Sequence, residues 1–188
     1  MLLRCHCVYA DPGAGGNCSC TLEPGQAPDC RGKKSPGCSA PGVANYKKKG
    51  LYIGYRGYEK QGIAPAFCFG HGLSYTSFSY SNLRATTSSV TVDVANTGTL
   101  AGADIPQLYL GFPSATGVET PAKQLKGFNK TSILPPGAKT TVMFPLRDRD
   151  LSIWSVAVHD WVVQKGTFVA MVGRSACDLR INTTFESK

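Results

Sequence analysis

Residues 89–98 read SVTVDVANTG, and this stretch decides the fold. Val90, Val92 and Val94 alternate with polar residues, which is the period-2 pattern of a strand with one buried face and one exposed face. The alternation stops at Asn96-Thr97-Gly98, which is a typical turn sequence. The stretch therefore predicts a half-buried β-strand that ends in a tight turn.

The same alternation recurs in most of the C-terminal half of the chain. Strand candidates lie in Ile105 to Leu110, Leu125 to Phe128, Val142 to Leu146, Trp161 to Val163, Phe168 to Val172 and Leu179 to Phe185. Turn sequences at 112–114 (FPS), 134–137 (LPPG) and 165–166 (KG) separate them, and no window shows an apolar face at helical spacing. About seven short strands in about 100 residues predict an all-β, immunoglobulin-like sandwich.

We expect the sandwich core to consist of the larger apolar residues of these strands. The expected core residues are Val92, Leu108, Leu110, Phe144, Trp154, Trp161, Phe168 and Val172.

Composition divides the 188 residues into three parts. Residues 1–44 form an irregular segment rich in Cys, Gly and Pro, residues 45–82 are rich in Tyr, Phe and Gly, and residues 83–188 carry the strand pattern. The middle part predicts short strands and tight turns. A chain of this length holds one ordinary domain with additional segments.

The N-terminal cysteines leave several interpretations open. They are Cys5, Cys7, Cys18, Cys20, Cys30 and Cys38. His6 lies between the first two and is the best metal-ligand candidate, because thiolate and imidazole suit zinc. The spacing is C-x-C, ten residues, C-x-C, unlike the usual zinc knuckle, so we expect no metal and no cofactor. Disulfide-linked loops and unstructured or out-of-frame sequence are the other two interpretations.

Charge and hydropathy exclude two classes of partner. The net charge of +8 divides into +5 over residues 1–60 and +3 over residues 83–188, where both signs are interspersed. A nucleic-acid-binding protein would show a basic stripe with interleaved aromatic residues, so we expect no nucleic-acid partner. No stretch approaches the roughly 20 apolar residues of a membrane span, and no signal peptide is visible.

Three sequons favour a secreted, extracellular parent protein. Asn17, Asn129 and Asn182 each begin an N-x-S/T sequence and are the glycosylation candidates.

Two aromatic and glycine-rich runs resemble segments of a known protein family. They are residues 50–60 (GLYIGYRGYEK) and 65–76 (PAFCFGHGLSYT). From the second run onward, residues 67–78 (FCFGHGLSYTSF) resemble the FPFGxGLSYTxF segment that leads from the α/β sandwich domain of family 3 glycoside hydrolases into their fibronectin type III-like domain. Cys68 replaces the usual proline and adds an eighth thiol, for which the sequence indicates no partner. The resemblance continues through residues 95–98, 102–111, 121–130, 134–137 and 168–175, so it covers about residues 45–188.

The resemblance implies the C-terminal part of a β-glucosidase. Residues 45–82 would be the remnant of the α/β sandwich domain with its linker, and residues 83–188 the fibronectin type III-like domain. In the family, the nucleophilic aspartate lies in an N-terminal barrel and the acid/base glutamate lies in the body of the sandwich domain, both upstream of the matching region. These enzymes hydrolyse terminal non-reducing β-D-glucosyl residues with two carboxyl groups about 5–5.5 Å apart. We therefore expect this chain to contain no catalytic or substrate-binding residue.

The implied partners are the barrel and sandwich domains of the same protein, and glucan or an oligosaccharide is a further candidate. We expect Tyr52, Ile53, Tyr55 and Phe67 to expose surface that those domains would bury.

Local acidic residues and histidine offer weaker alternatives. Asp148 and Asp150 flank Arg149, and a charged turn explains them better than a catalytic pair. The other isolated acidic residues, expected at the surface or in turns, are Glu59, Asp104, Asp160 and Asp178. His71 lies at a linker position of the family segment.

Aromatic side chains could stack on sugar rings, although burial in a core is their more common fate. The candidates are Tyr52, Tyr55, Tyr58, Trp154 and Trp161, with Tyr55 and Tyr58 the better two. Two other functions remain open: a stand-alone carbohydrate- or protein-binding module, and a small Cys-rich metal-binding or effector protein.

Overall fold

A computed structural model describes residues 50–114 and 118–188, which form a β-sandwich preceded by one short helix. The all-β sandwich expected from the sequence is confirmed. The elements are α2 (Tyr55–Gln61), β1 (Phe78–Ala85), β2 (Ser89–Asn96), β3 (Gln107–Gly111), β4 (Gln124–Phe128), β5 (Lys139–Pro145), the 3-10 helix η2 (Asp148–Leu151), β6 (Ser152–Ser155), β7 (Asp160–Val163), β8 (Gly166–Ser175) and β9 (Asp178–Ser187). Residues 1–44, with their cysteines, His6 and Asn17, lie outside the described residues.

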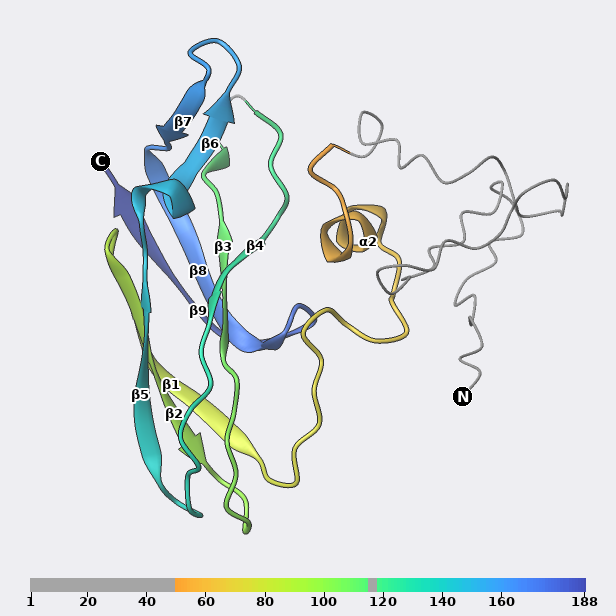
Figure 1. Cartoon of the computed structure of the whole chain (residues 1–188), viewed down its shortest axis with the longest axis vertical. Helices are drawn as coiled ribbons and strands as arrows, with labels where there is room; N and C mark the ends of the chain where they lie inside the picture. The colour runs from red at the N-terminus through yellow and green to blue at the C-terminus, as the bar shows by residue number, and fades with distance from the viewer. Residues whose placement is uncertain (1–49, 115–117) are drawn as a thin grey trace, which may run out of the picture. The chain divides into compact units, whose positions relative to one another are not determined.

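The strands form two main antiparallel sheets and a separate hairpin (Figure 1). One sheet has the order β1-β2-β5 and the other has the order β4-β3-β8-β9. The hairpin pairs β6 with β7. Within the described ranges, no helix is long and apolar enough to cross a membrane.

The core lies between the two sheets, and β2 supplies its centre. Val90, Val92 and Val94 are completely buried, as the alternation predicts. Val90 pairs with Phe144 and Val92 with Val142 on β5, so the strands share one inward face. Six of the eight expected core residues are buried here: Val92, Leu108, Leu110, Phe144, Phe168 and Val172.

The two tryptophans are the exceptions, and their predicted burial is wrong. Trp154 and Trp161 are 45% and 39% exposed because they lie on the β6–β7 hairpin, outside both main sheets. Alternation along a strand indicates burial only where a second layer covers one of its faces.

Two further differences concern residues 45–82. The helix α2 was not expected, because Gly54, Gly57 and Gly62 suggested turns. Gly54 and Gly62 instead flank the helix in backbone conformations of positive φ, and Gly62 caps its C-terminus by donating to Glu59 O and Tyr58 O. The first strand begins at Phe78, before the period-2 pattern that starts near Leu83.

Candidate interdomain docking surface

Residues 50–77 come before the first strand of the sandwich and are called the preceding segment. They pack on the outer face of the β4-β3-β8-β9 sheet. Side chains alternate along β3, so Leu108 and Leu110 enter the core while Tyr109 points to the opposite face. Tyr109 is nevertheless completely buried. The ring of Tyr55 meets the Tyr109 ring edge-on at 6.0 Å and stacks on Phe69 at 4.8 Å. The segment therefore supplies the layer that buries this outer face.

Polar contacts of α2 hold the helix against β4 and the loop before it. The Tyr55 hydroxyl accepts a hydrogen bond from Leu125 N at 2.8 Å. Glu59 forms an ion pair with Lys123, and Lys60 forms another with Glu119. The expectation that Glu59 is isolated is therefore wrong. Exposed ion pairs contribute only about 0–1 kcal/mol each, so the aromatic contacts carry more of the packing.

A buried glutamine fixes the middle of the segment. Gln107 Nε2 donates to Gly70 O at 2.9 Å and to Arg174 O at 2.7 Å, while its Oε1 accepts from the Tyr109 hydroxyl at 2.7 Å. One side chain thus connects the preceding segment, β3 and the end of β8. Gly70 has a φ of +78°, and a Cβ there would lie 2.2 Å from Gln107 Oε1, so the close approach requires glycine.

A disulfide joins the same two regions covalently. Cys68 in the preceding segment is bonded to Cys177 in the turn between β8 and β9. Beside it, Ala176 N donates to Phe69 O at 2.9 Å. The sequence indicated no partner for Cys68, and the structure corrects this.

The other end of the segment is anchored at the turn that ends β2. Thr76 donates to Asn96 Oδ1 at 2.7 Å, and Asn96 Nδ2 donates to Leu100 O and Leu134 O. The turn sequence recognised at Asn96 therefore also holds the entry to the sandwich.

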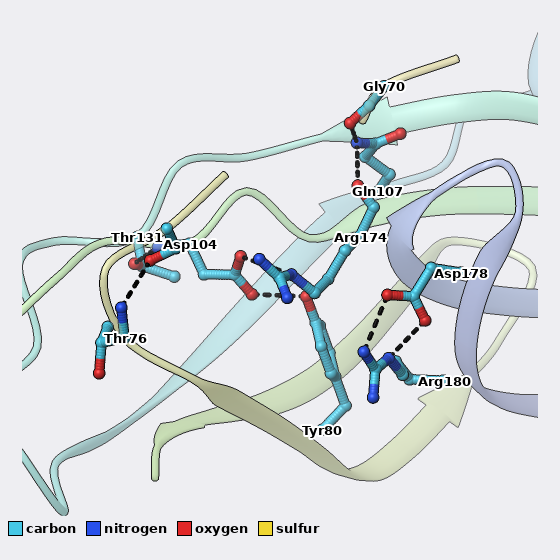
Figure 2. Close-up of polar contacts among 10 residues, drawn as sticks. Gly70, Thr76, Tyr80, Asp104, Gln107, Thr131, Arg174, Asp178 and Arg180 are labelled. Carbon is cyan, nitrogen blue, oxygen red and sulfur yellow. Dashed lines mark hydrogen bonds and ion pairs between the residues drawn. The ribbon is translucent and has the colours of Figure 1, made fainter. Parts of the chain in front are cut away.

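A charged network joins β1, β8 and the loop before β3. Figure 2 shows Tyr80 and Arg174 converging on the carboxylate of Asp104. Tyr80 donates at 2.5 Å, Arg174 Nε lies 4.0 Å away, and Asp104 N donates to Thr131 Oγ1 at 3.0 Å. Burial, and then the hydrogen bond to Asp104, raise the pKa of Tyr80. Asp104 was expected at the surface or in a turn, but it is buried.

A cavity of about 390 Å³ opens beside this network. One wall is residues 69–74 of the preceding segment, and the other consists of residues 103–105 with Gln107, Leu125, Phe128 and Arg174. His71 lies in the first wall, with its ring 5.9 Å from that of Phe67. Asp104 is the acidic residue in the cavity wall, and its carboxylate already contacts the Tyr80 hydroxyl and the Arg174 guanidinium. The residues that line the cavity therefore include no free pair of carboxylates.

Large apolar side chains project from the segment instead of packing on the sheet. Tyr75 is 99% exposed, Leu73 94% and Phe67 79%. Ile53 is also exposed, whereas Tyr52 and Tyr55 are half-buried. The expectation of exposed surface is thus correct for Phe67 and Ile53 and wrong for Tyr55, whose ring and hydroxyl are both engaged. Tyr58 remains exposed.

The remaining acidic candidates lie on η2, β7 and β9. Asp148 and Asp150 lie on η2, where Asp150 is buried and bonded to Arg147 N and Arg147 Nε. The charged turn preferred from the sequence is therefore present. Asp178 pairs with Arg180, and Asp160 is exposed on β7. Among the described residues, no group of three His, Cys, Asp or Glu side chains could hold a metal ion.

The sequence alone missed the two central features, Gln107 and the disulfide. Gln107 lies in a strand whose other residues are buried, and a glutamine there is a signal that a polar partner approaches.

Comparisons with known proteins agree with this architecture. The fibronectin type III-like domain family matches residues 104–176. The probable β-glucosidase D of Aspergillus niger is 40% identical over 161 residues, which cover 73% of this chain and 21% of that protein. The solved β-D-glucoside glucohydrolase of Trichoderma reesei aligns with a TM-score of 0.72 and 37% identity, covering 79% of this chain and 24% of that one. A family 3 (GH3) β-glucosidase of Bifidobacterium adolescentis aligns with a TM-score of 0.68, 30% identity and coverage of 74% and 21%.

The chain thus spans about a fifth to a quarter of the length of these relatives. It is the counterpart of the C-terminal part of family 3 β-glucosidases and carries their accessory fibronectin type III-like domain.

Proposed function

We propose that the described residues are a non-catalytic docking domain of a secreted β-glucosidase-like enzyme. In the proposed parent, residues 45–82 close the α/β sandwich domain and residues 83–188 form the accessory domain. The partners are then the barrel and sandwich domains of the same protein. The reaction of the parent is hydrolysis of terminal non-reducing β-D-glucosyl residues, with glucan or oligosaccharide as substrate.

The exposure of Leu73 and Tyr75 is the observation that carries this proposal. Both side chains are almost fully exposed, although the segment between them and α2 is fixed by Gln107 and by the Cys68–Cys177 disulfide. A rigid segment that presents large apolar side chains is typical of a surface that another domain covers.

Secretion is supported by the disulfide and by two sequons. Disulfides persist in oxidising compartments. Asn129 and Asn182 are exposed, as a glycan requires. Thr131, the hydroxyl residue of the Asn129 sequon, is buried against Asp104 in the folded chain, so we propose that any glycan at Asn129 is added before folding is complete.

Hydrolysis of an aryl β-glucoside tests the absence of catalysis. The purified 188-residue chain should show no turnover under conditions in which an intact family relative is active. Turnover that co-purifies with the chain and is lost in Asp148→Asn would contradict the proposal.

A further inference from the structure

The β6–β7 hairpin presents a pair of aromatic rings that the docking surface does not use. Trp154 and Trp161 are register partners across the hairpin, so they project from the same face. Their ring centroids are 5.8 Å apart, with an interplanar angle of 68°. Each ring limits the movement of the other, and both remain substantially exposed.

Arg149 and Asp148 of η2 and the two indole N–H groups have no hydrogen-bond partner for their side chains among the described residues. The guanidinium of Arg149, from η2, lies 4.0 Å from the centroid of the Trp161 ring. Within the described ranges it forms no hydrogen bond or ion pair, in contrast to the neighbouring Arg147, which is paired with Asp150. The exposed carboxylate of Asp148 and the indole N–H groups are also without partners among the described residues.

This combination matches the chemistry of a sugar. A pyranose ring has a face of C–H groups, which are attracted to the negative face of an indole. Its hydroxyls both donate and accept, so they can pair with the fixed fork of a guanidinium, with a carboxylate and with indole N–H groups. A protein partner with an apolar face would leave Arg149 and Asp148 desolvated and unpaired, which is costly.

Local charge also favours a neutral ligand. Arg149 and Asp148 carry opposite charges on the same 3-10 helix, and the exposed Asp160 beside Trp161 adds a negative charge, so an anionic ligand is disfavoured. An extended β-linked glucan is neutral, and in an equatorially linked chain every residue presents a C–H face.

We propose that Trp154, Trp161, Arg149 and Asp148 form a binding platform for a β-glucan chain. The platform is independent of the docking role, because none of its residues lies in the preceding segment. It favours the two tryptophans over Tyr55 as sugar-stacking candidates, since Tyr55 is half-buried against Phe69 and Tyr109, whereas Trp154 and Trp161 contact each other and Arg149 but remain 45% and 39% exposed.

The chain provides an internal reporter for this site. It contains two tryptophans, and both belong to the pair. Intrinsic tryptophan fluorescence of the 188-residue chain therefore reports the platform alone. Titration with cellohexaose should give a saturable change in intensity or emission maximum, whereas the α-linked maltohexaose should give none or a much weaker one.

Substitutions separate the platform from the rest of the surface. Trp154→Ala and Arg149→Gln should each weaken retention by soluble β-glucan in affinity electrophoresis by at least about tenfold, while Tyr75→Ala, an exposed aromatic residue elsewhere, should be retained like the unsubstituted chain. Circular dichroism verifies that each variant is folded, and Arg149→Gln keeps both rings. Absence of any response to cellohexaose, equal retention of Arg149→Gln, or a concentration-dependent dimer that quenches both tryptophans would each overturn the proposal.

Discussion

Gln107 Nε2 donates to the main-chain oxygen of Gly70 at 2.9 Å, which connects two residues 37 positions apart. This bond joins the preceding segment to the centre of the sheet. Because Gly70 has a positive φ and no space for a Cβ, the contact depends on glycine.

Gly70→Ala should therefore destabilise the chain. The Cβ would displace the Gln107 amide and impose a backbone conformation that alanine disfavours, at a cost of about 1–3 kcal/mol in the free energy of unfolding. Gly72→Ala is the matched control, since a Cβ there meets nothing within 4 Å and its φ is not positive. Urea unfolding measures both. Equal midpoints for the two variants would contradict this account of Gly70.

Removing the disulfide should loosen the segment without unfolding the sandwich. Cys68→Ser/Cys177→Ser should lower the free energy of unfolding by about 2–4 kcal/mol and increase cleavage of residues 62–77 by proteases. Because six further cysteines lie in residues 1–44, reduction of the unsubstituted chain is compared with reduction of this variant. Dithiothreitol should speed cleavage only in the former. Non-reducing peptide mapping that finds Cys68 and Cys177 unlinked would refute the linkage itself.

Tyr80→Phe removes a single oxygen atom, but it should lower the free energy of unfolding by more than such a small change suggests. The substitution leaves Asp104, which is buried, with only the more distant Arg174, so we expect a loss of about 1–3 kcal/mol. Tyr75→Phe is the matched control, because its hydroxyl has no partner among the described residues. Thermal unfolding compares them, and indistinguishable midpoints would exclude a stabilising role for the Tyr80–Asp104 bond.

Stability should decrease in mild acid, partly through Asp150. Burial alone would raise the pKa of this carboxyl, but the hydrogen bonds and charge of Arg147 outweigh it, so the pKa lies below its ordinary value. The unfolded chain then takes up the proton first, and the stabilisation that is present above about pH 4 is lost as the pH falls through the lowered pKa. Asp150→Asn should weaken this pH dependence, whereas Asp148→Asn should preserve it, because the Asp148 carboxylate has no partner among the described residues. Midpoints recorded between pH 3 and pH 7 provide the comparison.

The sequence predicts those features that depend on neighbouring residues. The alternation of Val90, Val92 and Val94 places β2 and its buried face correctly because the period of a strand is local. The same signal fails for Trp161, since burial depends on a covering layer that no local pattern encodes.

The site depends mostly on contacts between distant residues. Cys68 and Cys177 are separated by 109 positions, and Asp104, in the loop before β3, contacts Tyr80 from β1 and Arg174 from β8. The family segment at residues 67–78 located the preceding segment, but its partners on the sheet emerge only from the fold.

The docking role of Leu73 and Tyr75 is tested most directly by comparing one pair of substitutions in two settings. Leu73→Ser/Tyr75→Ser is introduced into the isolated chain and into a chimera, in which residues 50–188 replace the equivalent segment of the Trichoderma reesei glucohydrolase. Val158→Ser, an exposed apolar residue on the hairpin, is the control.

Thermal unfolding and residual aryl β-glucosidase activity after heating are then recorded. We predict an unchanged midpoint for the isolated double variant, because both side chains are already in solvent. In the chimera, the substitutions would remove apolar contacts with the covering domain, so we predict a decrease of at least about 2 °C in the midpoint. An unchanged chimera, or an equal decrease in both settings, would contradict the docking function.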